Sequence, residues 1–172
     1  MNIEKILNDK KVKSKEKIET ISKMLLDKKI SLNELIRFAK ISKDPVKATC
    51  IEAIEFATKN KPKIASSACL EFVSQTLSEK APRVKWESAK VIGNITRLYP
   101  NGLDEAIKNL MINANHSGTV VRWSAAFALG EIIKMKTAKN KYLIPKIEFI
   151  CKREEKNSIK KIYLEALKKA KQ

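Results

Sequence analysis

A segment that returns at a nearly constant interval constrains the fold of this chain more than any other feature. Residues 84–93 (VKWESAKVIG) return as residues 121–130 (VRWSAAFALG), with weaker copies at 46–54 and 159–167. The copies begin roughly every 37–38 residues, at Val46, Val84, Val121 and Ile159. Independent helices would not keep such a period, so the sequence predicts stacked structural repeats.

Each repeat is predicted to be a pair of helices, because a second apolar helical pattern lies between successive copies. We expect a single domain over residues 1–172, made of an irregular helical cap and four helix pairs. The predicted cap covers residues 1–30, and the repeats cover 31–60, 61–99, 102–136 and 140–172.

Local signals suggest where several of these helices begin. Ser31 and Glu34 form a capping box, in which each side chain bonds a free backbone N–H of the first turn. Pro62 is expected to open a helix, and Pro145 to lie in the first turn of another, because the first turn tolerates a residue without an N–H.

The repeated segment resembles the second helix of a HEAT repeat, a unit of the armadillo-like α-solenoid family. Residues 121–132 match the consensus pattern of the family, V-R-x-x-A-A-x-A-L-G, and residues 84–95 match it nearly as well. The resemblance covers roughly residues 31–172 and implies an all-α superhelix of antiparallel helix pairs. It also implies a scaffold without enzymatic activity that binds proteins, and sometimes nucleic acids, through its concave face.

The chain is strongly basic, with a net charge of +17 and a pI near 9.8. Such a balance favours association with nucleic acid, anionic lipid or an acidic protein. The alternative is that the lysines only keep the exteriors of the helices soluble, and the sequence leaves both interpretations open. No stretch approaches the ~18 apolar residues of a membrane span, and no signal peptide is recognisable, so we expect a cytoplasmic protein.

Three cysteines occur, Cys50, Cys69 and Cys151, and they are far apart within apolar helical patterns. There is no CxxC pair, and His116 is the only histidine. This pattern argues against a zinc site, a disulfide framework and a Cys/His nucleophile. We therefore expect reduced cysteines packed in the core, and neither a metal nor another cofactor.

Two tryptophans hold the same position in neighbouring repeats, on the side of each helix opposite its apolar stripe. In a stack whose second helices line the concave face, they would stand side by side. The sequence therefore predicts a partner-binding surface for a protein or peptide, with an acidic partner as one option. Its residues are Trp86, Lys90, Arg97, Trp123, Phe127 and Lys134. The alternative is that each tryptophan is buried in the seam between repeats.

A basic residue follows the leading aliphatic residue in every copy, at Lys47, Lys85, Arg122 and Lys160. This series would suit a row of phosphates or carboxylates. The favoured interpretation is that these basic residues bond one repeat to the next. Their position flanks the core on the helical wheel, and the HEAT consensus also has a basic residue there.

A second functional hypothesis is a basic nucleic-acid-binding protein related to HEAT-like alkylpurine DNA glycosylases. In those enzymes, a catalytic Asp lies about one turn after a tryptophan of the cleft. Here the residues four positions after Trp86 and Trp123 are Lys90 and Phe127. We therefore expect no catalytic activity, and nucleic-acid binding that is weak and independent of sequence.

Overall fold

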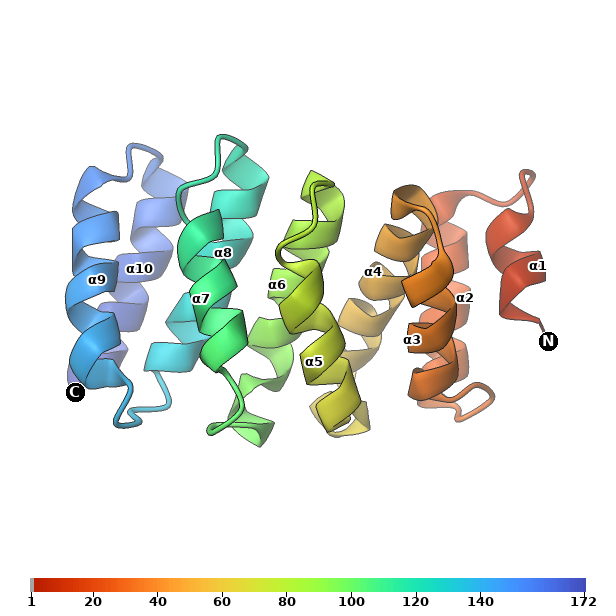
Figure 1. The fold of residues 1–172 in the computed structure, drawn as a ribbon, viewed down its shortest axis with the longest axis horizontal. Helices are drawn as coiled ribbons and strands as arrows, with labels where there is room; N and C mark the ends of the chain where they lie inside the picture. Colours follow the sequence, from red (N-terminus) through yellow and green to blue (C-terminus); the bar gives the residue numbers. More distant parts are fainter. Residues whose placement is uncertain (1) are drawn as a thin grey trace.

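The computed structural model describes residues 2–172 and shows a stack of helices without any strand in that range (Figure 1). The helices are α1 (Ile3–Asn8), α2 (Ser14–Leu26), α3 (Leu32–Ile41), α4 (Asp44–Asn60), α5 (Ser67–Thr76), α6 (Pro82–Ile95), α7 (Asp104–Asn113), α8 (Thr119–Ile133), α9 (Asn140–Arg153) and α10 (Asn157–Lys171), with short 3-10 turns η1 (Pro62–Ile64) and η2 (Thr96–Leu98). The predicted all-α architecture is confirmed.

The second helix of each predicted repeat begins two residues before the repeated aliphatic residue. These helices are α4, α6, α8 and α10. Pro45 and Pro82 lie in the first turns of α4 and α6, where their fixed φ suits the helix and no N–H is missed. The period of the sequence is therefore the period of the structure.

Two expected helix starts differ from the structure. Pro62 opens only the 3-10 turn η1, and α5 begins at Ser67 because the side chain of Ser66 caps it by accepting the Cys69 N–H. Helix α9 begins at Asn140, which leaves Pro145 inside the helix, beyond its first turn. The Ser31 half of the predicted capping box is confirmed, since the Ser31 hydroxyl accepts the Glu34 N–H at 3.1 Å.

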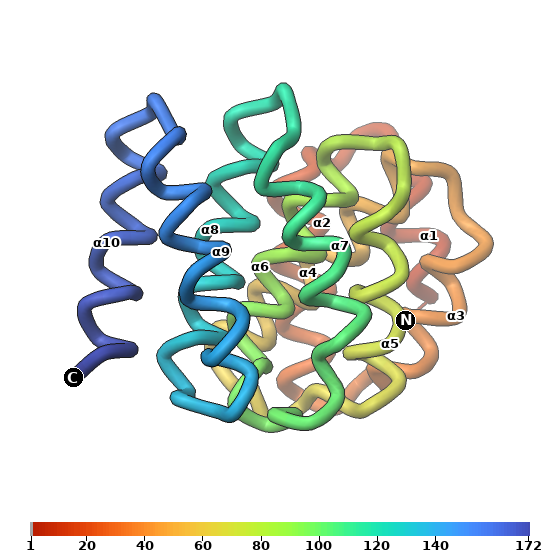
Figure 2. The backbone as a smooth tube through the Cα atoms, turned by 60° about the vertical axis from the view of Figure 1, so that its left-hand side comes forward, coloured from red at the N-terminus to blue at the C-terminus, as the bar shows by residue number. Residues whose placement is uncertain are grey.

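The helices form two layers, which Figures 1 and 2 show from two directions. The first helices α3, α5, α7 and α9 make one layer, and α2, α4, α6, α8 and α10 make the other. Contacts between neighbours are much more extensive in the layer of second helices. Because the closer-packed layer of a curved stack lies on its inner side, we call its open surface the inner face.

The core lies between the two layers and runs along the whole stack. Fully buried aliphatic side chains come from both layers, among them Leu35 and Leu110 from first helices and Ile92 and Leu129 from second helices. No helix among residues 2–172 is long and apolar enough to cross a membrane.

The three cysteines belong to this core, as predicted: all are buried and free. Burial raises the pKa of both Cys50 and Cys69 to about 12. The thiolate is the nucleophilic form, so these thiols are unreactive at neutral pH and serve as small apolar packing groups.

Candidate functional site

Trp86 lies on α6, on the side of the helix opposite its apolar stripe. Its side chain is half-buried, and its indole Nε1 donates a hydrogen bond to Glu87 Oε1 at 2.7 Å. The bond holds the ring beside a carboxylate that is itself buried. Trp86 is thus neither free in solvent nor sealed inside the seam between repeats.

Lys90 joins α6 to α4 through a compact charge network. Its Nζ lies 3.0 Å from Glu87 Oε2 and 3.4 Å from Glu55 Oε2, and both glutamates are only 4% exposed. Burial raises the pKa of Glu87, while Lys90 opposes that rise. Burial disfavours the charge of Lys90, but the two glutamates outweigh it and raise the pKa of this lysine. Lys90 is therefore an internal counter-ion rather than a free cation.

Trp123 and Phe127 lie one turn apart on α8 and stack on each other. Their ring centroids are 6.1 Å apart and the rings are inclined by 13°. Phe127 covers Gly93 of α6 so closely that a Cβ added there would lie 2.3 Å from Phe127 Cε1. Phe127 therefore belongs partly to the seam between α6 and α8, whereas Trp123 remains 39% exposed.

The two remaining predicted residues lie toward the C-terminal ends of the same helices. Arg97 is exposed in η2, and Lys134 forms an ion pair with Glu131 one turn earlier. The structure thus brings Trp86, Lys90, Trp123 and Phe127 onto neighbouring helices, with Arg97 and Lys134 at one edge. Whether they bind a partner stays a prediction.

Sequence reasoning missed several contributors to this surface. Arg83 Nη2 bonds Glu52 Oε2 at 2.6 Å across α4 and α6, and Glu55 completes the network around Lys90. Phe56 is a partly exposed aromatic residue of α4. The wheel of α4 could have indicated Phe56, because it falls on the polar side of that helix. The ion pairs carry no local signal, since their partners are more than 30 residues apart.

Three of the four recurrent basic residues hold successive repeats together. Lys47 Nζ bonds Glu79 at 2.9 Å, and Lys85 Nζ bonds the Leu77 carbonyl at 3.0 Å and Asn113 Oδ1 at 3.1 Å. Arg122 Nε bonds Glu154 at 3.0 Å, and its Nη1 donates to the carbonyls of the loop before α8. Glu79, Asn113 and Glu154 belong to the following repeat, whereas the Leu77 carbonyl and the carbonyls before α8 belong to the same repeat as the side chain that bonds them. Lys160 has no such partner within residues 2–172.

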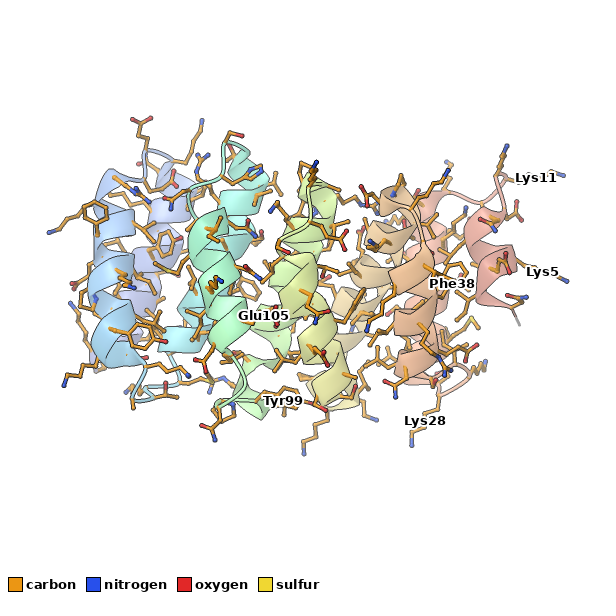
Figure 3. The ribbon with its side chains drawn as sticks, in the orientation of Figure 1. Lys5, Lys11, Lys28, Phe38, Tyr99 and Glu105 are labelled. Carbon is orange, nitrogen blue, oxygen red and sulfur yellow. The ribbon has the colours of Figure 1, made fainter. Side chains whose placement is uncertain are left out.

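The surface lysines at the amino-terminal end have a different role. Lys5, Lys11 and Lys28 are exposed and extend away from the stack (Figure 3). They lie far from the aromatic residues of α6 and α8. A large part of the positive charge is therefore dispersed over the exterior of the stack.

No protein-family model matches this sequence, and no curated protein is significantly similar to it. Solved structures do share its fold. A designed armadillo repeat protein in complex with the peptide (KR)4 has a TM-score of 0.75 at 19% identity, covering 98% of this chain and 80% of that one. The chain has an armadillo-like helical-repeat fold. A second designed armadillo repeat protein aligns with a TM-score of 0.73 at 16% identity, covering 98% and 80%, and an engineered protein with 0.75 at 17%, covering 99% and 80%.

This similarity confirms the predicted α-solenoid. At identities below 20% it concerns the fold alone. A shared fold does not determine a shared function, so the function has to be argued from the surface itself.

Proposed function

We propose that this protein is a non-enzymatic scaffold that binds a segment of another protein along its inner face. The observation that carries the proposal is the exposure of Trp123, stacked on Phe127, next to the helix that presents the half-buried Trp86. Tryptophans that keep part of their surface accessible on a rigid support are typical centres of binding energy. The designed armadillo protein in complex with (KR)4 supports a peptide as the class of ligand.

The charges of the inner face support binding through aromatic side chains more than through charge. Lys90 is paired with Glu55 and Glu87, Lys134 is paired with Glu131, and Arg83 is paired with Glu52. These pairs leave little net charge at the centre of the face. An acidic partner for this face therefore remains a prediction without support from the local charge.

The same pairs favour a binding role over a catalytic one. A general acid or base needs a pKa suited to proton transfer and access to a substrate. Here the carboxylates beside Trp86 are buried and bonded to Lys90, and the pKa of that lysine is raised. The residues one turn after the two tryptophans are Lys90 and Phe127, which gives base excision no carboxylate at that position.

The test is to select peptides that bind the chain from a display library and to measure their affinity by calorimetry. Changing Trp86→Ala and Trp123→Ala together should weaken binding by about 2 kcal/mol, or roughly 30-fold, because the aromatic contact area is lost. Circular dichroism should show the helices unchanged. Ile41→Ala, an exposed apolar residue at the end of α3 and outside the inner face, is the control and should bind normally. Peptides that bind the double variant as tightly as the wild type would contradict the proposal.

A further inference from the structure

A second apolar surface lies on the opposite layer, in the groove between α7 and α9. Two adjoining cavities of about 370 and 450 Å³ follow this groove, and both are lined by Met111 and Lys146. Tyr142 lines the first cavity, and Phe149 with Arg153 lines the second. We call this surface the outer groove. It contains none of the residues of the inner face.

The groove is open because α7 and α9 pack loosely. Neighbouring first helices contact each other between α3 and α5 and between α5 and α7, whereas α7 and α9 have little contact. Asn109 Nδ2 bonds the Ser74 carbonyl at 2.9 Å and so holds α7 against α5. Figure 1 shows α7 and α9 as the two first helices nearest the C-terminal end of the stack.

Large apolar side chains remain exposed on these two helices. Phe149 is 65% exposed, Tyr142 is 44% exposed, and Ile112 on α7 is 61% exposed. Leaving apolar area in water costs about 25 cal/mol per Å², so exposed apolar side chains that line adjoining cavities, here Tyr142 and Phe149, mark an interaction surface. The core between the layers contains enough aliphatic residues without them, and they contribute little to its packing.

The same helices supply cations that have no carboxylate partner within residues 2–172. These are Lys108, Lys146 and Arg153, whereas Asp104 is already paired with Lys139. Lys146 Nζ lies 5.8 Å from the centre of the Tyr142 ring, and the Arg153 guanidinium lies 5.3 Å from the centre of the Phe149 ring. Rings and cations thus alternate along α9 as Tyr142, Lys146, Phe149 and Arg153, a spacing that keeps all four on one side of the helix.

We infer that the outer groove is a second docking site, for an acidic amphipathic helix of a partner protein. The three unpaired cations select a partner with carboxylates at the borders of its apolar side. The backbone groups of α7 and α9 are bonded within their own helices, so neither wall offers the free edge that an extended strand would pair with. Tyr142 and Phe149 are about 10 Å apart along the axis of α9, which is two helical turns. This spacing fits a partner helix with apolar anchors at i, i+4 and i+7.

The experiment uses two helical peptides of about 18 residues, with leucine at i, i+4 and i+7, either glutamate or lysine at the borders of this apolar side, and alanine elsewhere to avoid repulsion between like charges. The acidic peptide should bind at least ten-fold more tightly than the basic one, and its affinity should fall as salt is raised. Phe149→Ala should weaken binding of the acidic peptide at least ten-fold without changing the helix content, since this side chain is exposed. Equal binding of both peptides, or an unchanged affinity of the Phe149 variant, overturns the inference.

A matched charge control separates the groove from the overall charge of the chain. Lys146→Glu should weaken the acidic peptide at least ten-fold, whereas Lys40→Glu, the same change on the exposed surface of α3, should weaken it less than two-fold. An equal loss in both variants would show attraction to the +17 charge only and overturn the site. A scrambled peptide with the same residues should bind weakly, because it lacks a continuous apolar side.

Three further measurements test other occupants and keep this site distinct from the inner face. The Trp86→Ala and Trp123→Ala variant should bind the acidic peptide normally, so loss of one site leaves the other measurable. In sedimentation experiments the wild type should form no dimer through Phe149 as its concentration is raised. A dimer of this kind would be recognised by its loss in Phe149→Ala. Such a dimer would assign the groove to a second copy of the chain. Duplex DNA that competes with the peptide at physiological salt would assign the groove to nucleic acid.

Discussion

The inner face and the outer groove are built from the same kinds of side chain in opposite surroundings. On the inner face, Phe127 packs over Gly93 and Lys90 lies between two buried glutamates. In the outer groove, Phe149 is largely exposed and Lys146 has no carboxylate partner in the described part of the chain. Residue composition alone would therefore not show which of the two surfaces is available to a partner. Their difference shows that a cation near an aromatic ring is available to a partner only if the fold has not already neutralised it.

The largest effect should follow from removing the internal counter-ion of the inner face. Lys90→Met leaves Glu55 and Glu87 buried without compensation, which should lower the free energy of unfolding by about 3–4 kcal/mol. Lys146→Met, the same change in the outer groove, should alter it by less than about 0.5 kcal/mol. Urea denaturation of both variants is the measurement. A similar loss of unfolding free energy in both variants would contradict the distinction between a lysine neutralised within the fold and one available to a partner.

A somewhat smaller contrast is expected within the series of recurrent basic residues. Arg122→Ala removes the partner of the buried Glu154 and should cost about 3 kcal/mol, because the carboxylate remains desolvated. Lys160 occupies the same position in the next copy without that partner, so Lys160→Ala should cost less than about 0.5 kcal/mol. Thermal unfolding of the two variants would measure this, and a Lys160 variant as unstable as the Arg122 variant would refute the structural role of the series.

The pH dependence of stability should have opposite signs at two glutamates. Burial works to raise the pKa of Glu154, but bonds from the Lys156 N–H and Arg122 and the charge of Arg122 hold it below its ordinary value. Glu154 therefore stabilises the fold above that value, and this contribution is lost as pH falls through the lowered pKa. Burial holds the pKa of Glu87 above its ordinary value, so acidification through that raised pKa favours the folded state.

Two variants make these signs measurable against the wild type. With Glu154→Gln, the deficit in unfolding free energy should be largest at neutral pH and should narrow on acidification. With Glu87→Gln, the trend should be the opposite. The unfolding free energy of this variant should decrease relative to that of the wild type as the pH falls. Urea titrations between about pH 7 and pH 3.5 would measure both, and parallel trends would contradict the assigned environments.

The smallest effect concerns nucleic acid. Dispersed exterior lysines and neutralised inner-face cations should give only weak binding to random DNA duplexes, which vanishes as salt is raised to physiological levels. Fluorescence anisotropy of labelled duplexes at several salt concentrations would measure it. Tight retention at physiological salt, or release of alkylated bases, would favour the nucleic-acid hypothesis over a protein-binding scaffold.

The periodic part of the fold could be predicted because its signal is local. Apolar spacing and prolines fix where α4 and α6 begin, and the sequence therefore located each second helix within two residues. The same wheel correctly separated Trp86 and Trp123 from the core. In contrast, the pairing of Lys90 with Glu55 depends on how α4 approaches α6, which no local pattern records.

The outer groove was missed for a related reason. The stripe of Tyr142, Lys146, Phe149 and Arg153 is visible in the sequence, but a stripe of this kind usually packs against a neighbour. Its exposure follows from the loose packing of α9 against α7, which depends on distances between repeats. The sequence indicated which residues share a helix side, and the structure was needed to show which sides have no neighbour.

The bonds made by Lys47, Lys85 and Arg122 also give the stack a direction. Each residue reaches forward to the end of the first helix of the following repeat or to the loop after it, so this loop region depends on the helix pair before it. Stability in repeat proteins is a sum of intrinsic and nearest-neighbour terms, and here the neighbour term is asymmetric. When one helix pair opens transiently, the loop that follows it loses its anchor, while the loop that precedes it keeps its own. We therefore expect hydrogen exchange to spread from an opened repeat toward the carboxyl terminus faster than toward the amino terminus.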